Sequence, residues 1–198
     1  MGQGAEPRRP RLRDEELGAA VARAQEGDEA AFAAAYRMVH PGLVGYLRGL
    51  VGDRAEGVAA DAWREIAADL EQFRGDGARF RGWTATVARR HALALPGPAG
   101  VSGPRARAGQ EPASSSTARA LELIGELPCE QREAVLLRAV VGLDDPAAAR
   151  VLGTAPEAVS AAAREGLRWL ARQLGTQAPE GGAGEGGPDG PGERGMAG

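Results

Sequence analysis

Arginine is the residue type in this sequence with the clearest chemical consequence. All 24 of its basic side chains are arginine. The lack of lysine excludes the lysine of a phosphate-binding P-loop and any lysine Schiff base. Every cationic role of the protein must therefore be carried by arginine.

These arginines are unevenly distributed along the chain. Residues 14–71 carry twelve acidic side chains and five arginines, a net charge of −7, whereas residues 72–91 carry five arginines and one aspartate, a net charge of +4. The formal total is only −3, but the location of charge matters more for binding than the total. An acidic segment thus borders a basic strip, and a nucleic acid remains a possible partner.

Other chemistries find little support in the sequence. One cysteine, Cys129, allows no internal disulfide, and the two histidines, His40 and His91, supply no ligand set for a structural metal. No nucleophile and base are paired as in an enzyme, so the sequence predicts a non-enzymatic protein without metal or cofactor. No segment approaches the roughly 20 apolar residues of a membrane span. We expect a cytoplasmic protein with no membrane insertion.

The composition favours helices, because alanine, leucine, glutamate and arginine dominate and strand-forming residues are sparse. We predict an all-α fold of two small domains, at residues 14–95 and 118–174. Glycine- and proline-rich composition indicates a disordered tail at 1–13, a flexible linker at 96–117 and a second disordered tail at 175–198.

Caps and apolar periodicity divide the first domain into helices. We expect Asp14 and Asp28 to cap helices, Pro41 to interrupt one, and Asp53 with Glu56 to form a capping box. The helix after this box has a stripe of buried residues at i, i+4 spacing. The stripe consists of Val58, Ala62, Ile66 and Leu70. A later helix is expected to carry Phe80, Trp83, Val87 and His91 on one side.

The second domain is predicted to contain four short helices that end in a helix-turn-helix. Asp144 and Pro146 suit a helix start, and Gly142 and Gly153 suit helix ends. The inward face of the last helix is predicted to consist of Val159, Ala163, Leu167 and Leu170.

The order and spacing of these segments resemble the extracytoplasmic-function (ECF) class of bacterial RNA polymerase sigma factors. The resemblance to sigma region 2 is carried by Asp53-Arg54-Ala55-Glu56, Asp61-Ala62-Trp63, Phe73-Arg74-Gly75-Asp76, Phe80-Arg81-Gly82-Trp83 and Val87-Ala88-Arg89. The resemblance to region 4 is carried by Leu127-Pro128, Gln131-Arg132-Glu133, Leu136-Leu137-Arg138, Gly142-Leu143 and Leu152-Gly153.

The resemblance implies a sigma factor that directs the RNA polymerase core to promoter DNA and aids DNA opening. Its partners would be the clamp and flap regions of the polymerase, promoter DNA and an anti-sigma protein. Polymerase binding is implied for Glu56, Asp61, Trp63 and Arg64. A flipped base and the phosphates of the opened strand would be bound by Arg74, Asp76, Arg79, Phe80, Arg81, Arg89 and Arg90. The last helix would read the major groove through Pro156, Glu157, Ser160, Ala161, Arg164 and Arg168.

Several positions depart from the family pattern and leave alternatives open. Gly57 and Ala60 replace an acidic residue and a glutamine, and Ser160, Ala162 and Glu165 weaken the basic character of the last helix. The chain could therefore bind polymerase without reading promoters, or use only its helix-turn-helix as a DNA-binding regulator.

For individual residues, a structural role competes with a functional one. Core packing competes with base stacking for the large aromatic side chains. These are Trp63, Phe73, Phe80 and Trp83. A solvated helix end competes with DNA contact for Arg89 and Arg90.

Overall fold

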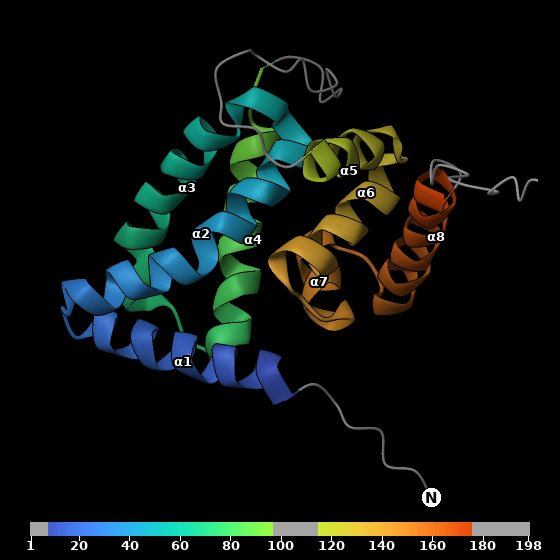
Figure 1. The fold of residues 1–198 in the computed structure, drawn as a ribbon. Coiled ribbons are helices and arrows are strands. Elements are labelled where there is room, and N and C mark those ends of the chain that lie inside the picture. The colour runs from blue at the N-terminus through green and yellow to red at the C-terminus, as the bar shows by residue number, and fades with distance from the viewer. Residues whose placement is uncertain (1–7, 97–114, 176–198) are drawn as a thin grey trace, which may run out of the picture.

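The computed structural model describes residues 8–96 and 115–175, and every regular element in these ranges is helical (Figure 1). The α-helices are α1 (Arg8–Gln25), α2 (Glu29–Val51), α3 (Ala55–Asp69), α4 (Gly77–Leu93), α5 (Ser115–Glu126), α6 (Cys129–Leu136), α7 (Asp145–Leu152) and α8 (Pro156–Gly175). Short 3₁₀ turns η1 (Gly52–Arg54) and η2 (Leu70–Gln72) flank α3, and the π-helical turn η3 (Leu137–Val141) extends α6. The prediction of an all-α fold is confirmed.

Helices α1 to α4 form a first body, in which α2 packs on α1 and α3, and α3 packs on α4. The predicted stripe of α3 is buried as expected. Its members, Val58, Ala62, Ile66 and Leu70, all belong to the core of this body. The i, i+4 spacing thus identified the inward face of α3 correctly.

Two expected helix boundaries in the first body are wrong. Helix α1 begins at Arg8 rather than at Asp14, because Pro10 stands in the first turn, where proline is tolerated, and the Asp14 carboxylate binds Arg81 instead. Helix α2 runs through Pro41 without interruption. Buried residues on both sides of this proline, including Val39 and Leu43, hold the helix together despite the lost hydrogen bond.

The expected capping box at Asp53 also does not form. Asp53 lies within η1, and α3 begins after it without a side-chain cap. The Glu56 carboxylate accepts a hydrogen bond from Arg48 of α2, 2.9 Å away, instead of binding a backbone N–H. An ion pair between neighbouring helices α2 and α3 has therefore replaced the capping box.

Other local signals were read correctly. Asp28 and Asp144 each accept a hydrogen bond from the backbone N–H three residues on, and so cap α2 and α7. Gly142 and Gly153 end their helices in the left-handed conformation, which glycine adopts without strain.

Helices α5 to α8 form a second body, in which α8 packs on α6 and α7. One prediction for α8 is wrong: Leu167 is 46% exposed. Gly166 lies inward in its place. A Cβ atom on Gly166 would lie 2.9 Å from Cγ2 of Val135, so glycine allows α6 and α8 to approach closely. The inward residues of α8 are Val159, Ala163, Gly166 and Leu170.

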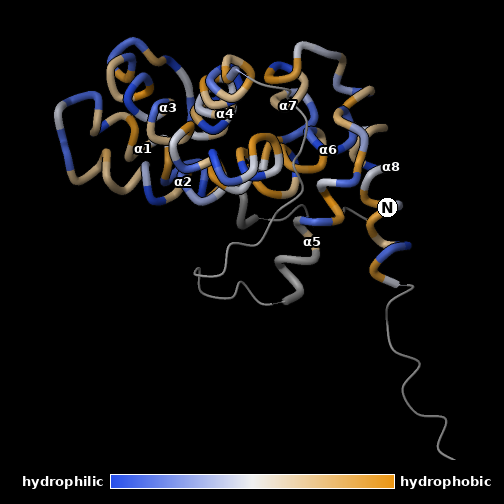
Figure 2. Tube along the Cα trace, turned by 90° about the horizontal axis from the view of Figure 1, so that it is seen from above, coloured by the Kyte–Doolittle hydropathy of each residue, from blue (hydrophilic) through white to orange (hydrophobic). Residues whose placement is uncertain are grey.

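The two bodies pack against each other, as both views show (Figures 1 and 2). Helices α2 and α4 contact α6, η3 and α7. Tyr46 of α2 and Ala85 of α4 are fully buried and belong to the same apolar cluster as the core of the second body. Of the predicted tails and linker, residues 1–7, 97–114 and 176–198 lie outside the described residues. Residues 8–13, predicted as part of a disordered tail, belong to α1, and residues 115–117, predicted as linker, belong to α5.

None of the helices in the described ranges is both long and apolar enough to cross a membrane.

Candidate functional site

The polar residues predicted to bind polymerase share the exposed face of α3. The Glu56 and Arg64 side chains are largely exposed, and Asp61 is half exposed. Asp61 and Arg64 form an ion pair one turn apart on this helix. Such surface pairs contribute little to stability, so this charged face is available to a partner.

Trp63 lies about two turns beyond Glu56, at the edge of the buried face of α3. Its side chain is buried in the core of the first body. Its ring meets Phe32 edge-on at a centroid distance of 6.1 Å and Tyr36 at 4.7 Å. Burial thus distinguishes Trp63 from the other predicted polymerase contacts, which are exposed, and the geometry matches the alternative of core packing.

The loop that precedes α4 is held in place by polar contacts that sequence reasoning missed. The Gln25 side chain of α1 donates hydrogen bonds to the carbonyl oxygens of Leu70 and Phe73, both at 2.8 Å. Asp76 caps α4 by accepting a hydrogen bond from the Arg79 backbone N–H at 2.8 Å. Because the Gln25 contacts link residues far apart in the sequence, no local motif identifies Gln25.

Aromatic side chains line the base of this loop. Phe73 stacks on Trp83 with a centroid distance of 5.1 Å, and both rings are partly exposed. Phe80 is fully buried and meets Phe73 edge-on at 5.3 Å. In this conformation Phe73 and Trp83 offer a surface for an unstacked base, whereas Phe80 supports them from below.

The predicted phosphate-binding arginines of α4 are each paired with a carboxylate. Arg81 binds Asp14 of α1 at 2.8 Å, and both side chains are mostly buried. Arg90 binds Glu65 of α3 while remaining largely exposed. The three carboxylates that pair with Arg81, Arg89 and Arg90 come from α1, α6 and α3. A phosphate would have to compete with these partners.

Arg89 has the most enclosed of these partners. Its Nε donates to Oε2 of Glu133 in α6 at 2.7 Å, and the Tyr46 hydroxyl donates to the same oxygen at 3.2 Å. The Glu133 side chain is only 7% exposed. Burial, followed by the nearby Glu133 carboxylate, raises the pKa of Tyr46 well above its ordinary value, so Tyr46 stays a hydrogen-bond donor. The hydrogen bond to Glu133 raises the pKa of Arg89.

The predicted reading face of α8 looks outward. Glu157, Ala161, Arg164 and Arg168 are exposed, and Pro156 and Ser160 are partly exposed. Arg164 donates its Nε to the Ser160 carbonyl at 3.1 Å, and Arg168 donates its Nε to the Arg164 carbonyl at 3.3 Å. These two guanidinium groups therefore lie along α8. The structure brings all six predicted residues to one side of α8.

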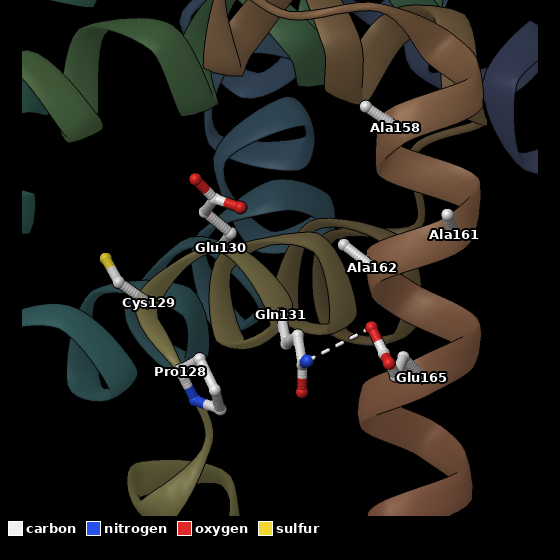
Figure 3. Close-up of a pocket in the computed structure, with 8 residues that line it drawn as sticks. All are labelled: Pro128, Cys129, Glu130, Gln131, Ala158, Ala161, Ala162 and Glu165. Carbon is white, nitrogen blue, oxygen red and sulfur yellow. Dashed lines mark hydrogen bonds between the residues drawn. The ribbon is translucent and has the colours of Figure 1, made fainter.

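A shallow groove of about 510 Å³ separates α6 from α8 (Figure 3). Gln131 of α6 bridges it by donating to Glu165 of α8 at 3.3 Å. Ala161, one of the predicted DNA contacts, lines this groove. The small side chains of Ala158, Ala161 and Ala162 leave the α8 side of this groove open.

Comparison with known proteins identifies the family. A model of sigma-70 region 2 matches residues 35–94, which span most of α2, all of α3 and α4, and the loop between them. The chain is 32% identical over 194 residues to ECF RNA polymerase sigma factor ShbA of Streptomyces griseus, a match that covers 82% of this chain and 100% of that protein. The chain belongs to the ECF family of RNA polymerase sigma factors. This sigma factor is a transcription protein, and its family is not a class of enzymes.

Solved structures share the fold of the sigma factor. CnrH, in complex with the cytosolic domain of CnrY, superposes with a TM-score of 0.60 at 23% identity, covering 84% of this chain and 99% of CnrH. The sigma factor RpoE of Bartonella quintana, in complex with the anti-sigma factor NepR, superposes with a TM-score of 0.58 at 20% identity, covering 74% of this chain and 98% of RpoE. As a sigma factor, the protein directs RNA polymerase to promoters.

Proposed function

We propose that the exposed face of α3 binds the polymerase clamp, that the loop before α4 and the α4 arginines hold the opened DNA strand, and that α8 reads an upstream duplex element. The observation that carries this proposal is that charged side chains are exposed on α3 of the first body and on α8 of the second body. Two separate displays suit a protein that contacts an enzyme and DNA at the same time.

The α3 display supports the polymerase contact through its charges. Glu56 and Asp61 are negative and Arg64 is positive on the exposed side of α3, and such a mixture of charges gives a docking surface orientation and selectivity. Trp63 stiffens this face from within the core. The second body would contact the flap region of the polymerase.

The DNA contacts divide by the kind of DNA. The partly exposed rings of Phe73 and Trp83 suit an unstacked base, because aromatic faces bind single strands by stacking. Arg164 and Arg168 suit the phosphates of a duplex, with Ser160 and Ala161 beside the base edges. We further propose that the protein acts without covalent chemistry in the cytoplasm and that an anti-sigma protein binds it, just as RpoE of Bartonella quintana forms a complex with the anti-sigma factor NepR.

Reconstituted transcription tests this function. Core polymerase and the full chain are incubated with promoter fragments from the source genome, and specific transcripts are measured. We expect transcripts that depend on the added chain. Asp61→Ala should lower binding to core polymerase, whereas Glu26→Ala, which removes one exposed acidic group from the α1–α2 turn of the same body, should not. Equal loss in both variants, or no specific transcript from a folded chain, would contradict the proposal.

A further inference from the structure

The contact between the two bodies is built around a buried polar cluster. Glu133 of α6 accepts hydrogen bonds from Arg89 of α4 at 2.7 Å and from Tyr46 of α2 at 3.2 Å. Arg89 also reaches the second carboxylate oxygen through Nη2 at 3.4 Å. One side chain of the second body thus holds two elements of the first body.

Glycines bring the helices close enough for this cluster to form. Along α2, Cβ atoms on Gly42 and Gly45 would lie 3.0 Å from the Val140 carbonyl oxygen and 2.7 Å from Cγ1 of Val140. A Cβ atom on Gly49 would lie 2.3 Å from Cδ1 of Leu136. The α2 face that receives the second body therefore has three glycines, where the two backbones approach closely, and Tyr46 lies among them.

The polar centre of this interface favours the packed arrangement only weakly. Desolvation of an ion pair offsets much of its attraction, and Arg89, Glu133 and the Tyr46 hydroxyl would each regain water on separation. On the first body's side the apolar part of the contact includes small residues, the α2 glycines and Ala85 of α4, which meet larger side chains such as Leu136 and Val140 of the second body. An interface with an ionic centre is suited to opening and closing.

Glu133 occupies the part of Arg89 that a phosphate would need. A guanidinium binds a carboxylate and a phosphate through the same N–H groups. We propose that the packed arrangement is a closed form, in which Glu133 acts as a latch that withholds Arg89 from the opened DNA strand. This inference rests on the proposed function, because it takes Arg89 as a DNA contact. Binding of the strand then requires the second body to release Arg89.

Spin-label distances test the latch without DNA. Nitroxide labels are placed on the full chain at Gly57→Cys in α3 and Ala171→Cys in α8, both exposed, with Cys129→Ser removing the native thiol. We expect a narrow distance distribution in this background and a broader, longer one after Glu133→Ala. Glu130→Ala, which removes the same charge from an exposed position of α6, should leave the distribution narrow. Retained helical circular dichroism with an unchanged distribution in Glu133→Ala would overturn the latch.

DNA binding tests its consequence. The probe is a fluorescein-labelled single-stranded oligonucleotide of mixed sequence, titrated over a salt series. Apparent affinity falls with the fraction of open molecules, so Glu133→Ala should bind more tightly than Glu130→Ala, by about tenfold if about a tenth of the molecules are open. The salt slope should stay the same, because Arg89 reaches the strand in both proteins. Equal affinity of the two variants would count against the latch.

A cross-link provides the opposite perturbation. Gly45→Cys with Val140→Cys, in the Cys129→Ser background, joins α2 to η3 where the two positions are in contact. The oxidised protein should bind the strand more weakly, with a salt slope shallower by about 0.7 for the one lost phosphate contact. Reductant should restore both values. Failure of the cross-link to form, or binding that is indifferent to it, would refute the closed form.

The two readouts separate this inference from the proposed function. In one outcome, Glu133→Ala changes the spin-label distances but Arg89→Ala does not change DNA affinity. The closed arrangement would then stand, but Arg89 would not be a DNA contact, and Glu133 could not act by withholding it. Distances that do not respond, with DNA binding that depends on Arg89, would defeat the latch and keep the DNA contact.

Discussion

Arginines on α4 and on α8 have the same predicted role but different surroundings. On α4, Arg81, Arg89 and Arg90 each pair with a carboxylate from another helix. On α8, Arg164 and Arg168 donate to carbonyl oxygens of their own helix and stand exposed. The comparison shows that arginines with the same inferred function can differ in availability. The α4 arginines are already paired with carboxylates of the fold, whereas the α8 arginines are exposed to solvent.

The largest effect should separate the two sets by stability. Arg89→Ala leaves the Glu133 carboxylate without its cation in the closed form, so the free energy of unfolding should fall by about 1.4 kcal/mol, the cost of opening when about a tenth of the molecules are open. Arg164→Ala removes an exposed side chain and should change it by about 0.5 kcal/mol or less. Urea unfolding followed by circular dichroism measures both. The double variant Arg89→Ala/Glu133→Ala should recover part of the loss, since no unpaired charge remains. Equal effects at Arg89 and Arg164 would erase the contrast.

The next effect concerns duplex DNA. The pair Arg164→Ala/Arg168→Ala should make the salt slope of binding shallower by about 1.8, because each phosphate contact contributes about 0.9. Arg90→Ala should change it less, since its guanidinium must exchange Glu65 for a phosphate. Fluorescence anisotropy with mixed-sequence duplex, over a salt series, provides the slopes. A slope in the α8 double variant equal to that of the unchanged protein would remove α8 from the duplex contacts.

A smaller effect should appear at Tyr46. Tyr46→Phe removes a donor to Glu133 and should lower the free energy of unfolding by about 1 kcal/mol at neutral pH. The pKa of Tyr46 is raised in the folded chain, so its stabilising contribution is complete below about pH 10, the unfolded value, and is lost as pH rises beyond it. Above pH ~10, the free energy of unfolding measured with urea should therefore fall more steeply with pH for the unchanged protein than for Tyr46→Phe. Parallel curves would indicate that Tyr46 ionises without cost.

The smallest effect should be at Cys129. Partial burial, then the adjacent Glu133 carboxylate, raises the pKa of this thiol, which lowers the thiolate fraction near neutral pH. Glu133→Gln removes the second cause, so alkylation by iodoacetamide should become faster by up to a few-fold. Mass spectrometry of the reaction measures the rate, with Glu130→Gln as the charge-matched control. An equal rate in both variants would argue that Glu133 does not control the thiol.

Local chemistry accounts for what the sequence predicted correctly. The caps at Asp28 and Asp144, the helix ends at Gly142 and Gly153, and the buried face of α3 depend on residues within one or two turns. The family motifs likewise placed the charged face of α3 and the outward face of α8.

Long-range packing accounts for what it missed. Asp14 was expected to cap a helix because its partner Arg81, 67 positions away, leaves no local trace. Pro41 was read as a break because propensity does not include the buried residues on either side of it. Leu167 was placed inward because the closer approach allowed by Gly166 depends on α6. The pairing of Arg89 with Glu133 has the same origin, since 44 residues separate the two.

The unbroken course of α2 has a consequence for how the molecule moves. Its 23 residues form a rod about 34 Å long at 1.5 Å per residue. The helix packs on α1 and α3, and the glycines in its second half, Gly42, Gly45 and Gly49, contact α6 and η3. Helix α2 is therefore a rigid element on which the second body packs. In the open form, its backbone amide hydrogens should still exchange as slowly after Pro41 as before it.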